Sequence, residues 1–144
     1  MRLFPLLLLG GAATWYFLRL RSLGANIKIN FRNVKISGGQ ILRPNIELTL
    51  GLQNPTSAAA NLSSIIGDLQ YEGQTIANFS SFEKVQIQGN TETIIKVNAV
   101  PNLIAVYNVI KNVIINRQPG KVLILSGRAN INNISVPFNS SFQF

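Results

Sequence analysis

The chain has 144 residues, no cysteine and no histidine, and its thirteen basic and five acidic side chains give a net charge of +8. Without cysteine, disulfides, thiolate chemistry and an acylated lipoprotein anchor are excluded, and without histidine the commonest general base and metal ligand is missing. An apolar content of 47% supports one folded domain with an appendage. The positive charge favours anionic surroundings such as lipid headgroups, nucleic acid or an acidic protein face, unless it serves solubility alone.

The N-terminal segment is apolar or small between Arg2 and Arg19. As a helix rising about 1.5 Å per residue it would span roughly 24 Å, slightly less than a hydrocarbon core of about 30 Å. We therefore expect residues 1–23 to form a single transmembrane anchor, with a cleaved signal peptide or a buried core helix as alternatives. The residues expected to contact lipid are Leu3, Leu6, Leu9, Trp15, Tyr16, Phe17 and Leu18.

A basic flank follows the anchor, and no acidic residue precedes Glu47. The flank consists of Arg19, Arg21, Lys28, Arg32 and Lys35. The positive-inside rule then places the following domain on the cytoplasmic side, or on the capsid side of a virion membrane. Beside an anchor each such charge contributes about 1 kcal/mol near anionic lipid. A topology signal on a solvated strand face and an acidic partner remain alternatives, whereas no aromatic-interleaved basic motif supports nucleic acid.

After residue 24 apolar and polar residues alternate, which is typical of strands. The alternation of residues 27–31 resumes one residue out of phase at Val34, which indicates a β-bulge near Arg32 and Asn33. Further strands are expected at residues 46–52, 65–71, around 76, 85–87 and 95–99. Their turns are expected at Asn54-Pro55, Glu72-Gly73 and Gly89-Asn90, with Pro101 ending the last strand.

The C-terminal third begins with apolar residues from Leu103 to Ile114 at spacings of three and four, which predict a short helix or, given their β-branching, a strand. Residues 118–120 stop this element, and residues 122–131 are expected to form a strand buried on both faces. The last strand alternates strictly, so at a sheet edge it would pair with another chain, whereas in the sheet centre it would simply pack in the core. Its candidate assembly residues are Ile134, Val136, Phe138, Phe142 and Phe144.

Seven or eight short strands with frequent turns predict a mainly β fold for residues 24–144, a two-sheet sandwich with one short helix at an end or edge. A closed barrel is the alternative. The predicted domain organisation is therefore an anchor at residues 1–23 and a sandwich at residues 24–144.

Several short motifs are shared with a known family: Leu52-Gln53-Asn54-Pro55, residues 67–73, Ile76-Ala77, residues 125–129 and residues 134–138. Together they resemble the late embryogenesis abundant type 2 domain, also called the water-stress-hypersensitivity domain. The similarity covers about residues 25–144, and it implies an immunoglobulin-like or fibronectin-like sandwich, often behind an N-terminal membrane segment, without catalytic residues or a cofactor. Plant members are linked to desiccation tolerance, but a shared fold does not transfer function.

Catalysis is not expected, because a nucleophile needs a neighbouring base and neither histidine nor cysteine is present. Asp68 and Glu72 flank a hairpin, where acids are usually solvated turn residues. Gly38-Gly39 lacks the lysine and helix of a phosphate-binding loop. We expect no cofactor and no metal site.

The expected function is a non-enzymatic structural or interaction module that tethers a β-sandwich to a bilayer. One version is a minor virion protein that links capsid and membrane in a lipid-containing virus. The alternative is a stress-protective or lipid-binding envelope protein of the late embryogenesis abundant type 2 kind. The expected partners are the bilayer and a protein, either another chain or a second copy of this one, and not nucleic acid.

Overall fold

The computed structural model describes residues 26–40, 43–101 and 110–144, so the predicted anchor at residues 1–23 lies outside the described residues. Within these ranges no helix combines the length and the apolarity needed to cross a bilayer. The chain forms strands and one π-helical turn, η2. The elements are β1 (Lys28–Gln40), β2 (Arg43–Asn54), β3 (Ala60–Tyr71), β4 (Gln74–Ser81), β5 (Val85–Ile87), β6 (Thr91–Pro101), η2 (Ile110–Ile115), β7 (Val122–Ile131) and β8 (Ile134–Gln143).

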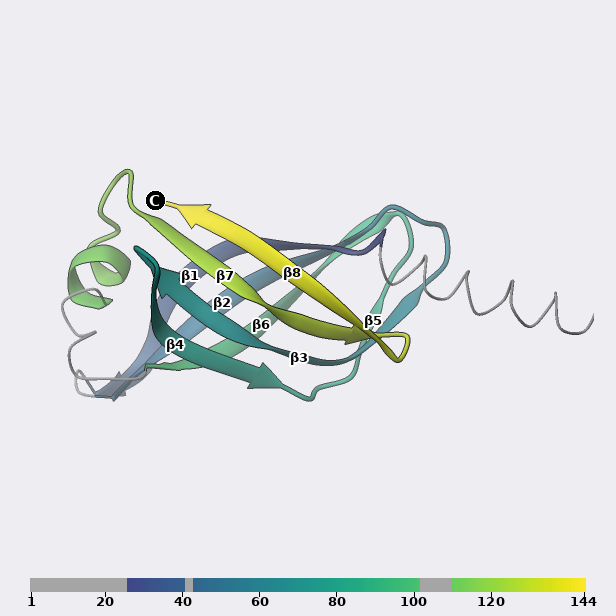
Figure 1. Ribbon diagram of the computed structural model, residues 1–144, viewed down its shortest axis with the longest axis horizontal. Coiled ribbons are helices and arrows are strands. Elements are labelled where there is room, and N and C mark those ends of the chain that lie inside the picture. The colour runs from purple at the N-terminus through teal and green to yellow at the C-terminus, as the bar shows by residue number, and fades with distance from the viewer. Residues whose placement is uncertain (1–25, 41–42, 102–109) are drawn as a thin grey trace, which may run out of the picture.

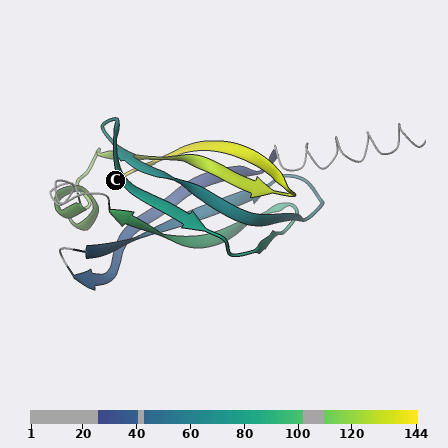
Figure 2. The ribbon, with the colours of Figure 1, turned by 60° about the horizontal axis from the view of Figure 1, so that its bottom comes forward.

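The strands form a single antiparallel sheet in the order β1-β2-β6-β4-β3-β7-β8, with β5 attached to β3. The sheet curls until its two end strands, β1 and β8, lie side by side (Figures 1 and 2). The mainly β prediction is confirmed, but the expectation of two separate sheets is wrong. One half, β1-β2-β6, is joined to the other through three residue pairs between β4 and β6, and the result is a barrel-like sandwich.

Local patterns placed several irregularities correctly. The register of β1 against β2 shifts between Phe31 and Asn33, which confirms the predicted bulge. The hairpin between β3 and β4 turns at Glu72 and Gly73, whose φ values of 50° and 78° suit a tight two-residue turn. The turn η2 lies at the end of the predicted helical stripe, and residues 102–109 of that stripe fall outside the described residues.

The expectation that β7 is buried on both faces is wrong. Leu123, Leu125 and Ala129 face the interior and are buried, but Val122 and Arg128 on the other face are exposed. The outer surface of this part of the sheet carries no second layer in the described part of the chain (Figure 1). The apolar outer residues of β7 therefore reflect strand propensity rather than burial.

The core fills the interior of the curled sheet. The strand β2 shows the pattern most clearly, because Ile46, Leu48, Leu50 and Leu52 are fully buried and alternate with residues of the outer face. Full burial of one such side chain contributes about 1.5–3 kcal/mol. The alternation of hydrophobic and polar residues in the sequence thus decides which face of the strand turns inward.

Two glycines of the resembling motifs pair with each other at a crowded point of this sheet. Gly67 lies opposite both Phe79 and Gly127, and Gly127 lies opposite Phe138. The two phenylalanine rings approach to 6.4 Å between centroids. A Cβ atom on Gly127 would lie only 2.0 Å from the carbonyl oxygen of Ile66, so the close approach of β3 and β7 requires glycine there.

Candidate functional site

The short strand β5 lies between two open hollows. It pairs only with residues 60–62 of β3 and stands outside the main strand order. A polar pocket opens on the side of the β7–β8 turn, and a groove opens on the side of β6. Leu62 and Val85 line both hollows.

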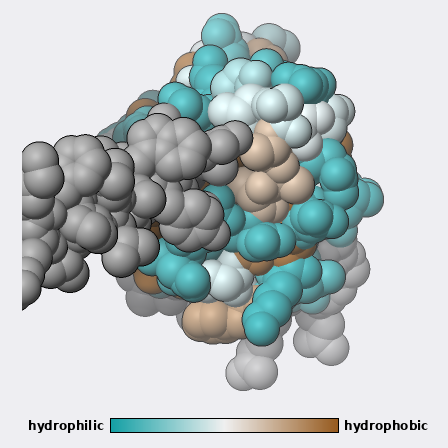
Figure 3. All heavy atoms as spheres, turned by 90° about the vertical axis from the view of Figure 1, so that its right-hand side faces the viewer, coloured by the Kyte–Doolittle hydropathy of each residue, from teal (hydrophilic) through white to brown (hydrophobic). Residues whose placement is uncertain are grey.

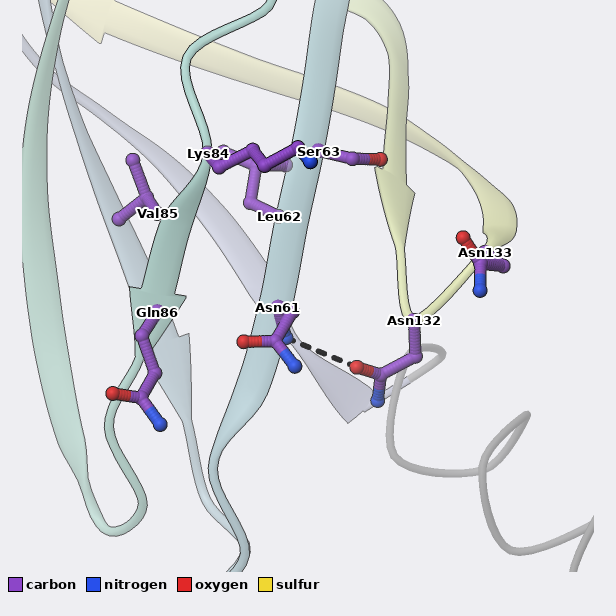
Figure 4. Close-up of a pocket in the computed structure, with 8 residues that line it drawn as sticks. All are labelled: Asn61, Leu62, Ser63, Lys84, Val85, Gln86, Asn132 and Asn133. Atoms are coloured by element: carbon purple, nitrogen blue, oxygen red, sulfur yellow. Dashed lines mark hydrogen bonds between the residues drawn. The ribbon is translucent and has the colours of Figure 1, made fainter.

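The polar pocket is an open hollow of about 700 Å³. Its wall at the β7–β8 turn is fixed by two hydrogen bonds. The Asn61 backbone amide donates to Asn132 Oδ1 at 3.0 Å (Figure 4), and the Asn132 backbone amide donates to the Asn61 carbonyl at 2.9 Å. Asn132 and Asn133 adopt positive φ, which lets this turn close over two residues. The lining residues are Asn61, Leu62, Ser63, Lys84, Val85, Gln86, Asn132 and Asn133.

The lining of this pocket supplies groups that form hydrogen bonds. The amides of Asn61 and Gln86 lie at one end of the pocket, and Lys84 and Ser63 lie at the other (Figure 4). Amide groups donate and accept hydrogen bonds, and the lysine adds one positive charge. None of the eight lining residues is acidic, so Lys84 carries the one charge of this lining.

The groove arises where β4 and β6 separate. Residues 77–79 of β4 pair with residues 99–101 of β6. Beyond Phe79 the chain moves away from β6 and continues into β5, which pairs with β3. The resulting hollow of about 330 Å³ has an apolar floor that includes the buried Leu62 and Val97. Its lining residues are Leu62, Ser81, Glu83, Val85, Ile94, Ile95, Lys96 and Val97.

An ion pair crosses the outer face of β1, β2 and β6. Arg32 donates from Nε and Nη2 to the two carboxylate oxygens of Glu92 at 2.6 Å and 2.5 Å. These hydrogen bonds hold the pKa of Glu92 below its ordinary value, and they raise the pKa of Arg32. Gly51 of β2 leaves room for the pair, because a Cβ atom there would lie 1.7 Å from Glu92 Oε1.

The predicted basic flank is partly paired with acids. Arg32 binds Glu92, while Lys35 lies 3.4 Å from Glu47 Oε1, which Lys96 also approaches to 3.8 Å. Lys28 is exposed at the start of β1, and Arg19 and Arg21 lie outside the described residues. Contact of this flank with lipid stays a prediction.

The two end strands meet along a seam, by which we mean the line where β1 and β8 lie side by side. The Phe31 backbone amide donates to Ser140 Oγ at 2.9 Å, and the rings of Phe31 and Phe142 lie 5.5 Å apart. In the described residues no strand ladder joins β1 to β8. Side chains therefore take the place of backbone pairing where the sheet closes.

Arg117, which follows η2, bridges this seam. It donates to the Val34 carbonyl at 3.1 Å and to Asn33 Oδ1 at 3.3 Å. The guanidinium also lies 5.7 Å and 5.2 Å from the ring centroids of Phe142 and Phe144. Sequence patterns did not identify this residue, because its partners on β1 are more than eighty positions away.

The candidate assembly strand, β8, lies at the end of the strand order, but β1 covers its free side. Its five predicted residues are half-buried and face inward, and three of them pack against the core: Phe138, Phe142 and Phe144. Pairing of β8 with another chain would require the seam to open, so assembly through this strand stays a prediction.

The comparisons with known proteins concern the fold. No family model and no curated protein matches the sequence. Among solved structures, AT1g01470 from Arabidopsis thaliana aligns with a TM-score of 0.58 over 81% of this chain and 80% of that chain, at 13% identity. A protein described as late embryogenesis abundant, At2g46140.1, aligns with a TM-score of 0.50 over 93% of this chain and 78% of its own, at 12% identity. This chain therefore shares the fold of these two proteins.

The acids of the described ranges do not gather into a metal site. Across residues 26–40, 43–101 and 110–144, no three side chains of the metal-binding types gather into a site. Two of the five acids, Glu47 and Glu92, instead serve basic residues of neighbouring strands. What the described surface offers is an amide-rich pocket and an apolar groove, both suited to binding.

Proposed function

We propose that this chain is a protein of the late embryogenesis abundant type 2 kind, which acts without catalysis and protects neighbouring proteins and lipid when water is lost. The observation that carries the proposal is the likeness of its barrel-like sandwich to the late embryogenesis abundant protein At2g46140.1. The motifs that resemble the type 2 domain support it independently, because they were read from the sequence alone.

The surface chemistry supports a protective role. The end of the barrel at which β1 begins is covered mainly by hydrophilic residues (Figure 3), and the amides of the polar pocket belong to this end. Amides can hydrogen-bond to a neighbour in place of departing water. The core of tightly packed apolar side chains keeps the domain folded. The proposed protection is therefore carried out by the residues on its surface.

Membrane attachment is the second part of the proposal. Residues 1–23 supply an apolar segment with a basic flank, and β1 follows it within a few residues. An anchor would hold the hydrophilic end of the domain close to the headgroups and raise its effective concentration there. Lys28 would add a positive charge beside anionic lipid.

The test of protection uses the full chain in phospholipid vesicles that also enclose a drying-sensitive enzyme. The vesicles are dried and rehydrated, and the enzyme activity and the leakage of an enclosed dye are measured. We expect higher retained activity and less leakage than with an unrelated single-span β-sandwich of equal mass. Equal losses in the two preparations would contradict the protective role.

The test of attachment compares the full chain with a form that lacks residues 1–23. After detergent-free lysis and alkaline washing, the full chain should stay with the membrane and the shortened form should not. Release of the full chain into the wash would refute the anchor. Protection by the shortened form at equal concentration would show that the domain acts without tethering.

A further inference from the structure

We propose that the open edge of β6 binds an extended, acidic segment of a partner protein as an added strand. On one side β6 pairs with β2 along residues 91–99. On the other side, in the described part of the chain, strand pairing is limited to residues 99–101 against β4. Residues 91–98 thus leave one row of backbone groups available for a ladder, as strand addition requires.

The two end strands of the sheet cover each other. β1 and β8 lie against each other, with Ser140 and Arg117 bonded to backbone groups of β1. The edge of β6 instead borders the groove, whose volume of about 330 Å³ lies between it and residues 81–85. An incoming strand on the β6 side of this groove finds both backbone partners and space.

Apolar side chains gather at this edge. The floor of the groove contains the buried Leu62 and Val97, while Phe82 and Ile94 beside it are 74% and 55% exposed. Successive side chains of a strand point to opposite faces, so every second residue of an added strand would face the floor. The partner should carry apolar residues at those positions, because burying them on the floor excludes water.

The positive charge of this chain favours acidic residues at the partner positions that do not face the floor of the groove. Lys96 lines the groove together with the acid Glu83, and Lys84 lines the polar pocket on the other side of β5. Glu47 of β2 also lies near, with its Oε1 3.8 Å from Lys96 Nζ. The whole chain carries a net charge of +8, so an approaching acidic segment is attracted from a distance as well. The occupant is therefore a segment of alternating apolar and acidic residues, and this inference stands independently of the protective function.

The experiment uses the full chain in detergent micelles and a blocked nine-residue peptide of alternating valine and glutamate as the probe. Binding is measured by fluorescence anisotropy, and its location by slowed amide hydrogen exchange at residues 92–98. We expect a peptide of alternating valine and lysine to bind at least about tenfold more weakly. Equal affinity for the two peptides would overturn the charge argument, and slowed exchange elsewhere would overturn the location.

A matched pair of variants isolates the edge. Ile94→Glu places a negative charge on the open strand, whereas Ile66→Glu changes an isoleucine of similar exposure (48% against 55%) on β3, which is paired on both sides. We expect Ile94→Glu to weaken peptide binding by about tenfold or more and Ile66→Glu to change it little. Equal effects of the two substitutions would refute the proposal, and circular dichroism of each variant verifies that it is folded.

Discussion

Arg32 and Glu92 meet across a third strand, with two hydrogen bonds of 2.6 Å and 2.5 Å passing over the bare backbone of Gly51. The pair joins β1 to β6, which do not neighbour each other in the sheet. Because Arg32 directly follows Phe31 at the bulge, the irregularity in β1 also sets the position of the guanidinium. This contact makes the stability of the domain sensitive to acid.

We expect the free energy of unfolding to fall as the pH drops through the lowered pKa of Glu92. The folded state depresses that pKa, so the stabilisation is fully present above the unfolded value of about 4.3 and is lost as the pH falls through the folded value. Urea titrations at neutral pH and at pH values around and below 4 measure the effect. Glu92→Gln should reduce the loss in acid, and Glu83→Gln, on the exposed β4–β5 link, should leave it unchanged.

Gly127→Ala should destabilise the domain by about 1–3 kcal/mol or more, because overpacking against a rigid backbone cannot be relieved. The added Cβ atom would meet the Ile66 carbonyl oxygen at 2.0 Å. Gly51→Ala is the matched control, since its Cβ atom meets the movable side-chain ends of Glu92 and Arg32 rather than backbone. Urea unfolding compares the two, and a Gly51→Ala loss as large as that of Gly127→Ala would contradict this explanation.

Ser140→Ala should lower the free energy of unfolding by about 1–3 kcal/mol, because the part-buried Phe31 amide loses its hydrogen-bond acceptor. Ser140→Thr should retain most of the stability, since it keeps a hydroxyl. Ser141 lies next to it on the exposed face of β8, so Ser141→Ala is the control. Thermal unfolding ranks the three variants, and similar midpoints for Ser140→Ala and Ser141→Ala would exclude a role for this hydrogen bond in the seam.

Arg117→Lys should loosen the seam although it keeps the charge. Lysine lacks the planar fork with which Arg117 reaches both Asn33 and the Val34 carbonyl, and it stacks less well on Phe142 and Phe144. Hydrogen exchange of β1 and β8 amides should become faster, while that of the β3–β4 pair should not. Uniform acceleration over the whole sheet would indicate global destabilisation instead.

The sequence predicted those features that depend on a few neighbouring residues. The phase slip before Val34 located the bulge, and Glu72-Gly73 located a turn, because both are decided by local backbone geometry. The alternation in β2 identified its inner face for the same reason. Gly67 and Gly127 both belong to the motifs that resemble the type 2 domain, but the motifs do not predict that the two residues pair with each other.

The sequence did not predict the features that depend on pairing between residues far apart in the chain. Whether the strands make one sheet or two depends on the short ladder that pairs Phe79 with Ala99, and no local pattern encodes it. Burial of the outer face of β7 was expected from its apolar residues, but strand propensity gives the same signal as burial. The Arg117 bridge and the groove beside β5 likewise follow from topology rather than from spacing.

The seam also has a consequence for how the chain folds. Phe31 and Ser140, which it brings together, are 109 positions apart, so closing it requires nearly the whole domain to be ordered first. Until β8 docks, β1 presents an unpaired edge of alternating apolar residues to its surroundings. Late closure would make the half-formed domain prone to aggregation during synthesis, and attachment to a bilayer that keeps neighbouring nascent chains apart would limit that risk.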